Sequence, residues 1–138
     1  MKTLFANSFF GAMLAIMAAV VVTGSGSSVS AAELVMFKSP GCTYCVIWNS
    51  ELGGVYSKTS EGKRAPLRRV DISDQKKTKG LKMPVRLTPT FVLMEKGKEV
   101  GRIQGYGGEG AFWMMLDELL AKLKTQKSHL ALNVHTAK

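Results

Sequence analysis

"SPGCTYC", residues 39–45, contains both cysteines of the 138-residue chain, with two residues between them. The apolar run ELVMFK (33–38) stands directly before it. A short apolar run that ends at a turn signal is typical of a buried strand. From Cys42 onward the spacing of the apolar residues becomes helical. The sequence therefore predicts a strand, a Pro-Gly turn and a helix whose first turn carries Cys42.

The predicted helix has one apolar face, formed by Cys45, Trp48, Leu52, Val55 and Tyr56. Gly53 and Gly54 interrupt it, and because glycine destabilises a helix interior, the helix is expected to bend or end there. A loop is expected at EGKRAP (61–66) and a second strand at LRRVDI (67–72). When a helix joins two strands of one sheet, the strands are parallel and the connection is right-handed.

The second half of the chain predicts a hairpin and a final helix. After a short helix capped by Ser73 or Asp74, strands are expected at FVLME (91–95) and KEVGRIQG (98–105). The two-residue turn between these strands makes them antiparallel. The last helix, EGAFWMMLDELLAKLK (109–124), has an apolar stripe of Phe112, Met115, Leu116, Leu119, Leu120 and Leu123.

This order of elements predicts an α/β fold, with a mixed four-stranded sheet and helices on both faces. The folded domain is expected to span residues 33–125, which is long enough to bury one modest core. Residues 126–138 are interpreted as a C-terminal tail without a predicted structure.

Residues 1–32 are interpreted as a secretory signal peptide. Lys2 is the only charged residue before Glu33, the apolar run FFGAMLAIMAAVVV covers residues 9–22, and small residues follow it. This is the three-part pattern of such a signal, with cleavage expected after Ala32 and a periplasmic location for the mature protein. An uncleaved membrane anchor is the alternative, although a spanning helix needs about 20 apolar residues.

The charge of the chain does not indicate a nucleic-acid partner. Lys and Arg number 19 against 10 Asp and Glu, for a formal net charge of +9. The basic residues are dense only in KRAPLRR (63–69) and KKTKGLK (76–82), and elsewhere they are scattered among acids. In a secreted protein this charge favours solubility and attraction to acidic partners or membrane surfaces.

The cysteine pair permits four kinds of site. Structural zinc requires four ligands, and the only histidines, His129 and His135, lie far away in the tail. Cu(I) can bind two thiolates, so a non-catalytic Cu(I) carrier remains an alternative. A structural disulfide that closes so small a loop would stabilise the protein little. The fourth possibility is a redox pair.

A redox pair explains the sequence around the cysteines best. At the start of a helix, unpaired backbone N–H groups and the helix dipole stabilise the thiolate of Cys42, which is the attacking species. Cys45 lies one turn further along and is expected to be less exposed. It can therefore resolve the mixed disulfide that Cys42 forms with a client protein, and this exchange needs no cofactor.

PGCTYC (40–45), followed about 45 residues later by TPTFVLMEKGKEVGRIQGYGG (88–108), resembles the thioredoxin superfamily, and secreted bacterial members in particular. The resemblance covers residues 33 to about 124. It implies a cis peptide bond at Thr88–Pro89, facing the cysteines and leaving the Thr88 backbone free to pair with an extended client. An ordinary edge-strand proline is the alternative for Pro89. Tyr44, between the cysteines, is expected to be exposed and to contact clients.

Two departures narrow the resemblance. Gly41 stands where thioredoxin has tryptophan, and in this respect the site is closer to that of glutaredoxins. Met36 stands where thioredoxin has a buried acid. The combination of signal peptide, minimal core and PGC-x-Y-C site is similar to the periplasmic thioredoxins of sulfur-oxidation (Sox) operons, the SoxS type. That resemblance implies a sulfur-carrier protein as client and a membrane electron donor of the DsbD type. General periplasmic disulfide reductases or isomerases, or a client-binding module tethered to the membrane, remain alternatives.

Two further patterns are interpreted as structural. GYGGEG (105–110) matches a dinucleotide-binding pattern, but no strand is predicted after the helix that follows it. It is therefore expected to be a flexible loop between strand and helix. Trp48 and Trp113 are interpreted as core residues.

Overall fold

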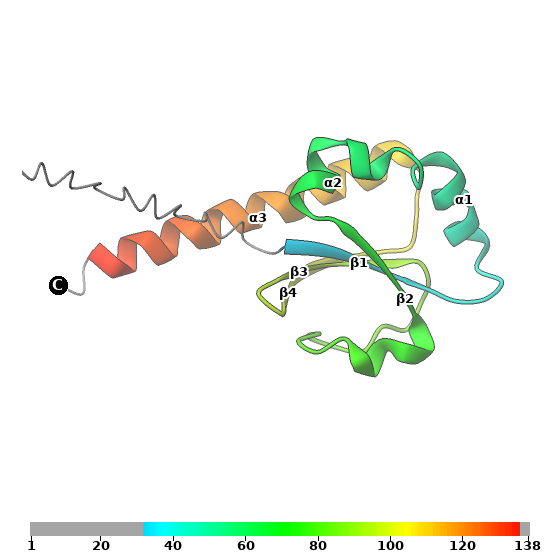
Figure 1. The fold of residues 1–138 in the computed structure, drawn as a ribbon, viewed down its shortest axis with the longest axis horizontal. Coiled ribbons are helices and arrows are strands. Elements are labelled where there is room, and N and C mark those ends of the chain that lie inside the picture. The colour runs from blue at the N-terminus through cyan, green and yellow to red at the C-terminus, as the bar shows by residue number, and fades with distance from the viewer. Residues whose placement is uncertain (1–31, 136–138) are drawn as a thin grey trace, which may run out of the picture.

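The computed structural model describes residues 32–135, with side chains as far as Thr125 (Figure 1). The predicted signal peptide, apart from Ala32, lies outside the described residues. The elements in chain order are β1 (Ala32–Lys38), α1 (Thr43–Glu51), η1 (Tyr56–Lys58), α2 (Ser60–Arg64), β2 (Leu67–Asp71), η2 (Ile72–Lys77), β3 (Thr90–Glu95), β4 (Lys98–Gln104) and α3 (Glu109–His135), where η denotes a 3-10 helix.

The four strands form one mixed sheet in the order β2-β1-β3-β4. β1 pairs in parallel with β2, with Leu34 opposite Leu67, and antiparallel with β3, with Met36 opposite Phe91. β3 and β4 form the predicted hairpin, and both turn residues, Lys96 and Gly97, have positive φ angles, as a tight two-residue turn requires. The predicted mixed sheet is confirmed.

The two faces of the sheet are covered unequally. Helices α1, α2 and α3 lie on one face, and η2 with the segment that follows it lies on the other (Figure 1). The larger core, under the three helices, includes Leu34, Met36, Phe91 and Leu93 of the sheet. A smaller core on the η2 face is built on Val35, Phe37, Val92 and Met94. Because successive side chains of a strand point to opposite faces of the sheet, β1 and β3 contribute residues to both cores.

Aromatic packing holds α1 against the sheet. Trp48 of α1 is fully buried, with its ring centroid 5.2 Å from Phe91 on β3 and 5.5 Å from Phe112 on α3. The guanidinium of Arg69 lies 5.8 Å from the same ring. Trp48 is therefore a core residue, as the sequence predicts. Trp113 was also expected in the core but is only partly buried, and its ring stacks on Tyr56 at 6.0 Å against the edge of the core.

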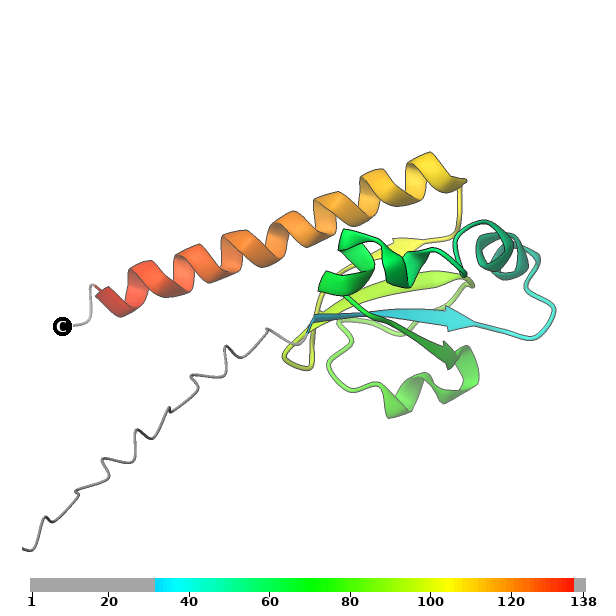
Figure 2. The ribbon, with the colours of Figure 1, turned by 45° about the horizontal axis from the view of Figure 1, so that its top comes forward.

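Three expectations about the helices need correction. Residues 60–64 form α2, where a loop was expected, because the side chain of Thr59 caps a helical turn by accepting from the Gly62 N–H. η2 is capped by Asp71, not by Ser73 or Asp74. The last helix does not end near residue 124, since α3 continues to His135 and projects past the sheet (Figure 2).

Candidate active site

The turn after β1 places Cys42 at the start of α1. Gly41 has a φ of 71°, a left-handed conformation that glycine adopts at no steric cost. Cys42 is the N-cap of α1, and its Sγ accepts a hydrogen bond from the Cys45 N–H at 3.2 Å. The first turn of α1 contains no acidic residue. The dipole and the free N–H groups at this helix start are therefore available to stabilise negative charge on Sγ.

Cys42 and Cys45 form a disulfide with an S–S distance of 2.12 Å. Cys45 is 4% exposed and belongs to the larger core, whereas Cys42 is only partly buried and packs at the edge of that core. A client sulfur can therefore reach Cys42 far more easily than Cys45. The expectation that Cys45 is the less exposed cysteine is confirmed, and the roles of attacking and resolving cysteine stay predictions.

The loop before β3 has the predicted cis peptide bond at Thr88–Pro89. The hydroxyls of Ser39 and Thr88 are hydrogen-bonded at 2.8 Å, which fastens this loop to the segment that leads into Cys42. The Gly105 N–H donates to the Pro89 carbonyl at 2.7 Å. Pro89 is buried and leads into β3, which pairs with a strand on each side, so it is not an ordinary edge-strand proline.

Thr88 itself has free main-chain groups. Its N–H and carbonyl make no backbone hydrogen bond to any described residue, and β3 begins only at Thr90. Backbone groups left unpaired beside a reactive sulfur can pair with an extended peptide. The roles of Thr88 and Pro89 in client binding remain predictions.

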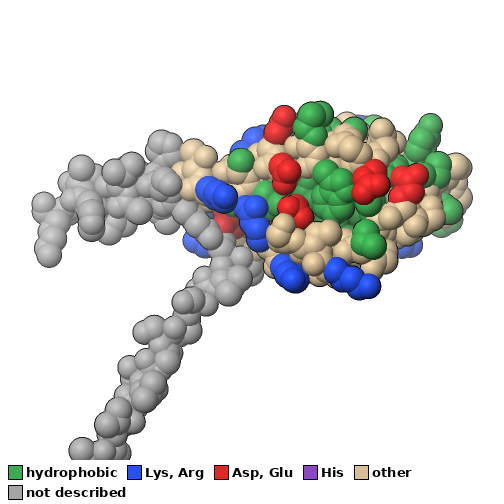
Figure 3. Space-filling model, turned by 90° about the horizontal axis from the view of Figure 1, so that it is seen from above, with side chains coloured by type: hydrophobic (Ala, Val, Ile, Leu, Met, Phe, Trp, Pro, Cys, Tyr) green, Lys and Arg blue, Asp and Glu red, His purple; other side chains and the backbone are tan. Residues whose placement is uncertain are grey.

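Several apolar side chains are exposed on α1 and on the loop before the cis bond. Tyr44 is 58% exposed, as expected, and Val46 and Ile47 on α1 and Leu87 before the cis bond are also exposed. Figure 3 shows hydrophobic side chains exposed on the helix-covered side of the molecule, including the end that carries α1. Exposed aromatic and aliphatic side chains are suited to contact a protein client, which is the role predicted for Tyr44.

At the position where thioredoxin buries an acid near its cysteines, this chain has the apolar residue Met36. Met36 is fully buried in the same core as Cys45. Among the described residues Glu99 is the only buried acid, and it lies near the hairpin turn, at the far end of β3 from Pro89. The proton of Cys45 therefore has no buried carboxylate acceptor within the described part of the chain.

Sequence reasoning missed how the loop after β4 is held. Tyr106 is nearly buried, and its hydroxyl donates to the carboxylate of Glu51 at the end of α1. Burial raises the pKa of Tyr106, and the hydrogen bond to Glu51 raises it further. Together with the Gly105 N–H bond to Pro89, this contact anchors a loop that was expected to be flexible.

Metal ligands do not gather at any point of the described chain. Over residues 32–125 no group of three or more His, Cys, Asp or Glu side chains is arranged to hold a metal ion. The side chains of His129 and His135 lie outside the described set. Cu(I) binding by Cys42 and Cys45 would first require reduction of their disulfide. Across residues 32–135, no helix combines the length and apolar character needed to span a membrane.

Comparisons with known proteins agree with this geometry. A thioredoxin-like domain model matches residues 30–120. Among solved structures, the chain is similar to the periplasmic thioredoxin SoxS of Paracoccus pantotrophus in its reduced form, with 43% identity and a TM-score of 0.64 over 67% of this chain and 98% of that one.

Two thioredoxins are more distantly similar. The thioredoxin of Fasciola hepatica has 22% identity and a TM-score of 0.49 over 64% of this chain and 81% of that one. The thioredoxin Mala s 13 of Malassezia sympodialis has 18% identity and a TM-score of 0.48 over 64% of this chain and 75% of that one. A search of curated protein sequences found no match.

Proposed function

The chain belongs to the thioredoxin-like family, and we propose that it serves in the periplasm as a thioredoxin of the SoxS type. Its fold and its Cys42–Cys45 pair make it a thiol–disulfide oxidoreductase. The observation that carries the narrower proposal is the 43% identity to a periplasmic SoxS over 98% of that chain. The client we propose is a sulfur-carrier protein whose cysteine must be kept reduced.

The reaction proceeds in two exchanges. In the reduced protein the Cys42 thiolate attacks one sulfur of the client disulfide, so that a Cys42–client bond forms and the other client sulfur leaves as a thiolate. Cys45 then loses its proton and attacks Cys42 Sγ. The second client thiolate leaves, and the Cys42–Cys45 disulfide forms. The client gains two electrons and the pair loses two.

The next turnover needs two electrons from a donor. In the periplasm we propose a membrane protein of the DsbD type, which would reduce Cys42–Cys45 by the same exchange in reverse. Secretion through the cleaved signal in residues 1–32 would place the protein beside such a donor. The mature chain, without Lys2, keeps 18 Lys and Arg against 10 Asp and Glu, and this excess of positive charge would help it to approach acidic partners.

The test is a stoichiometric reduction assay. The reduced protein is expected to convert one client disulfide to two thiols for each Cys42–Cys45 disulfide formed, and Cys42→Ser is expected to abolish the reaction. The sulfur-carrier protein with its cysteine in a mixed disulfide should be a better substrate than insulin. Equal rates on both would favour a general periplasmic reductase over the SoxS type.

A further inference from the structure

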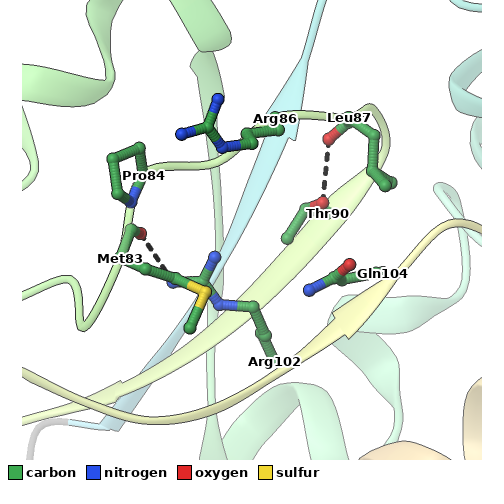
Figure 4. Close-up of a pocket in the computed structure, with 7 residues that line it drawn as sticks. All are labelled: Met83, Pro84, Arg86, Leu87, Thr90, Arg102 and Gln104. Carbon is green, nitrogen blue, oxygen red and sulfur yellow. Dashed lines mark hydrogen bonds between the residues drawn. The ribbon is translucent and has the colours of Figure 1, made fainter.

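A cavity of about 350 Å³ lies beside the loop that carries the cis peptide bond. It is lined by Arg102 and Gln104 of β4, Thr90 of β3, and Met83, Pro84, Arg86 and Leu87 of the preceding loop (Figure 4). Arg102 and Gln104 stand opposite Val92 and Thr90 in the β3–β4 ladder, so their side chains share the face that carries η2. The cavity is therefore on the opposite face of the sheet from α1.

Arg102 is a fixed part of the cavity wall. Its Nε and one Nη donate to the two carboxylate oxygens of Glu99 at 2.7 and 2.6 Å, and the same Nη donates to the Met83 carbonyl at 2.9 Å. The Arg102 side chain is only 10% exposed, and its other Nη makes no hydrogen bond to any described residue. That nitrogen remains available as a donor in the cavity.

Arg86 and Gln104 are unused donors at the same cavity. Both are exposed, and neither side chain makes a hydrogen bond or ion pair with any residue in the described part of the chain. In Figure 4 the side chains of Arg86, Arg102 and Gln104 approach the cavity from different sides. Thr90 Oγ1, by contrast, is occupied because it donates to the Leu87 carbonyl at 2.8 Å.

The charges around the cavity favour an anion. No carboxylate is among the residues that line it. The ion pair with Glu99 offsets the charge of Arg102, so the uncompensated charge is that of Arg86. A guanidinium binds a carboxylate with two parallel hydrogen bonds, and an amide N–H₂ such as that of Gln104 can add a third.

We propose that this cavity receives an Asp or Glu side chain of the client protein, within a few residues of the client's reacting cysteine. The inference rests on the proposed function and on the predicted pairing of the client with the backbone of Thr88. Leu87, which lines the cavity, directly precedes Thr88, and Arg86 is two positions away. An extended client advances about 3.3 Å per residue, so about two client residues span the stretch of loop from Thr88 to Arg86.

The test uses two synthetic peptides that differ in charge alone. Each carries one cysteine in a disulfide, with Glu at every position within about three residues of it in the first peptide and Gln in the second. The reduced wild-type protein is expected to show a KM roughly threefold to tenfold lower for the Glu peptide, with equal kcat. The preference should weaken as salt is added, because the cavity is open to solvent.

Arg86→Gln is expected to remove the preference, and Gln104→Ala to reduce it. The matched control is Lys63→Gln, which removes an exposed positive charge from α2 and should leave the preference unchanged. Arg86→Gln should reduce a neutral dipyridyl disulfide at the wild-type rate, because that substrate has no carboxylate. This rate also shows that the variant is folded.

Equal KM values for the two peptides with the wild-type protein would overturn the inference and leave the proposed function intact. A preference that survives in Arg86→Gln would overturn it as well. If the wild-type protein reduced neither peptide nor the dipyridyl disulfide, the proposed function itself would fail.

Discussion

The hydroxyl of Ser39 lies 2.8 Å from the hydroxyl of Thr88, although 49 residues separate them in the sequence. Ser39 begins the turn that leads into Cys42, and Thr88 precedes the cis bond to Pro89. This hydrogen bond therefore joins the segment that carries the attacking sulfur to the loop that we expect to hold the client. It adds to the pairing of β1 with β3, in which Phe37 lies opposite Thr90, in holding these two parts of the site together.

Replacing Ser39 with Ala is expected to lower kcat/KM for a protein disulfide several-fold, because the client would be positioned less exactly over Cys42. Loss of one hydrogen bond should lower the free energy of unfolding by about 1 kcal/mol. Reduction of a dipyridyl disulfide should change little. Ser50→Ala is the matched control, since the Ser50 hydroxyl bonds only to the Ile47 carbonyl on the exposed side of α1. Similar losses in both variants would contradict this role of Ser39.

The Cys42 thiol of the reduced protein is expected to have a pKa below the free value of about 8.5. The cause is its place at the N-cap of α1, where the Cys45 N–H donates to Sγ at 3.2 Å. The rate of alkylation by iodoacetamide as a function of pH gives the pKa, and mass spectrometry identifies the modified cysteine. A midpoint at or above the free value, or faster modification of Cys45, would reverse the assigned roles.

Protonation of the Glu99 carboxylate should make the protein less stable in acid. Burial raises the pKa of this carboxyl, but hydrogen bonds from Arg102 and from the Lys82 N–H lower it by more, so the folded-state pKa lies below the ordinary 4.5. A lowered folded pKa means that the ionised form stabilises the fold above pH 4.5, and that this stabilisation is lost as the pH falls through the folded value.

Glu99→Gln is therefore expected to lower the free energy of unfolding by about 2 kcal/mol near neutral pH. The difference from the wild type should shrink steadily as the pH falls below 4.5. Urea titrations across this range measure it. Glu118→Gln, on the exposed side of α3, is the control and should differ little from the wild type at any pH. A constant difference would show that Glu99 acts through packing alone.

The fold could be predicted where one short pattern is sufficient. The apolar run before Ser39 indicated β1, the helical spacing after Cys42 indicated α1, and the dipeptide at residues 96–97 indicated the hairpin. In each case a local rule and the tertiary structure favour the same conformation. The cis bond at Thr88–Pro89 came from family resemblance, because no local rule distinguishes it from a trans bond.

The parts that could not be predicted depend on contacts between side chains, and such contacts leave no periodic pattern in the sequence. Residues 60–64 have no apolar stripe, and α2 forms there because Thr59 caps it. The partners Ser39 and Thr88, or Tyr106 and Glu51, lie about 50 residues apart and are brought together only by the sheet. Arg102 could be placed on a strand, but its contacts with Glu99 and Met83 could not.

Signal cleavage is expected to leave a mature protein that begins near Glu33. The Glu33 carboxylate holds the guanidinium of Arg68 through two hydrogen bonds of 2.8 Å, whereas Ala32 adds one further residue to β1 opposite Glu95. A mature chain that begins at Glu33 would thus keep the ion pair between Glu33 of β1 and Arg68 of β2. Intact mass of the protein from the periplasmic fraction tests this, and a mass that retains residues 9–22 would show an anchored protein instead.

Trapping with Cys45→Ser tests the mechanism and the client together. Cys45 releases the client from Cys42, so its replacement removes release and leaves the attack in place. Mixed disulfides through Cys42 should accumulate in the periplasm, whereas Cys42→Ser should trap almost nothing. Non-reducing electrophoresis followed by mass spectrometry identifies the trapped proteins.

The identity of the trapped proteins separates the remaining alternatives. A SoxS-type protein should trap mainly a sulfur-carrier protein, and a general reductase or isomerase should trap a broad set of periplasmic proteins. Replacing Pro89 with Thr in the Cys45→Ser background should change which partners are held, because Pro89 shapes the loop beside Thr88. If nothing is trapped and the reduced protein binds Cu(I) tightly through Cys42 and Cys45, the cysteine pair serves as a metal carrier instead.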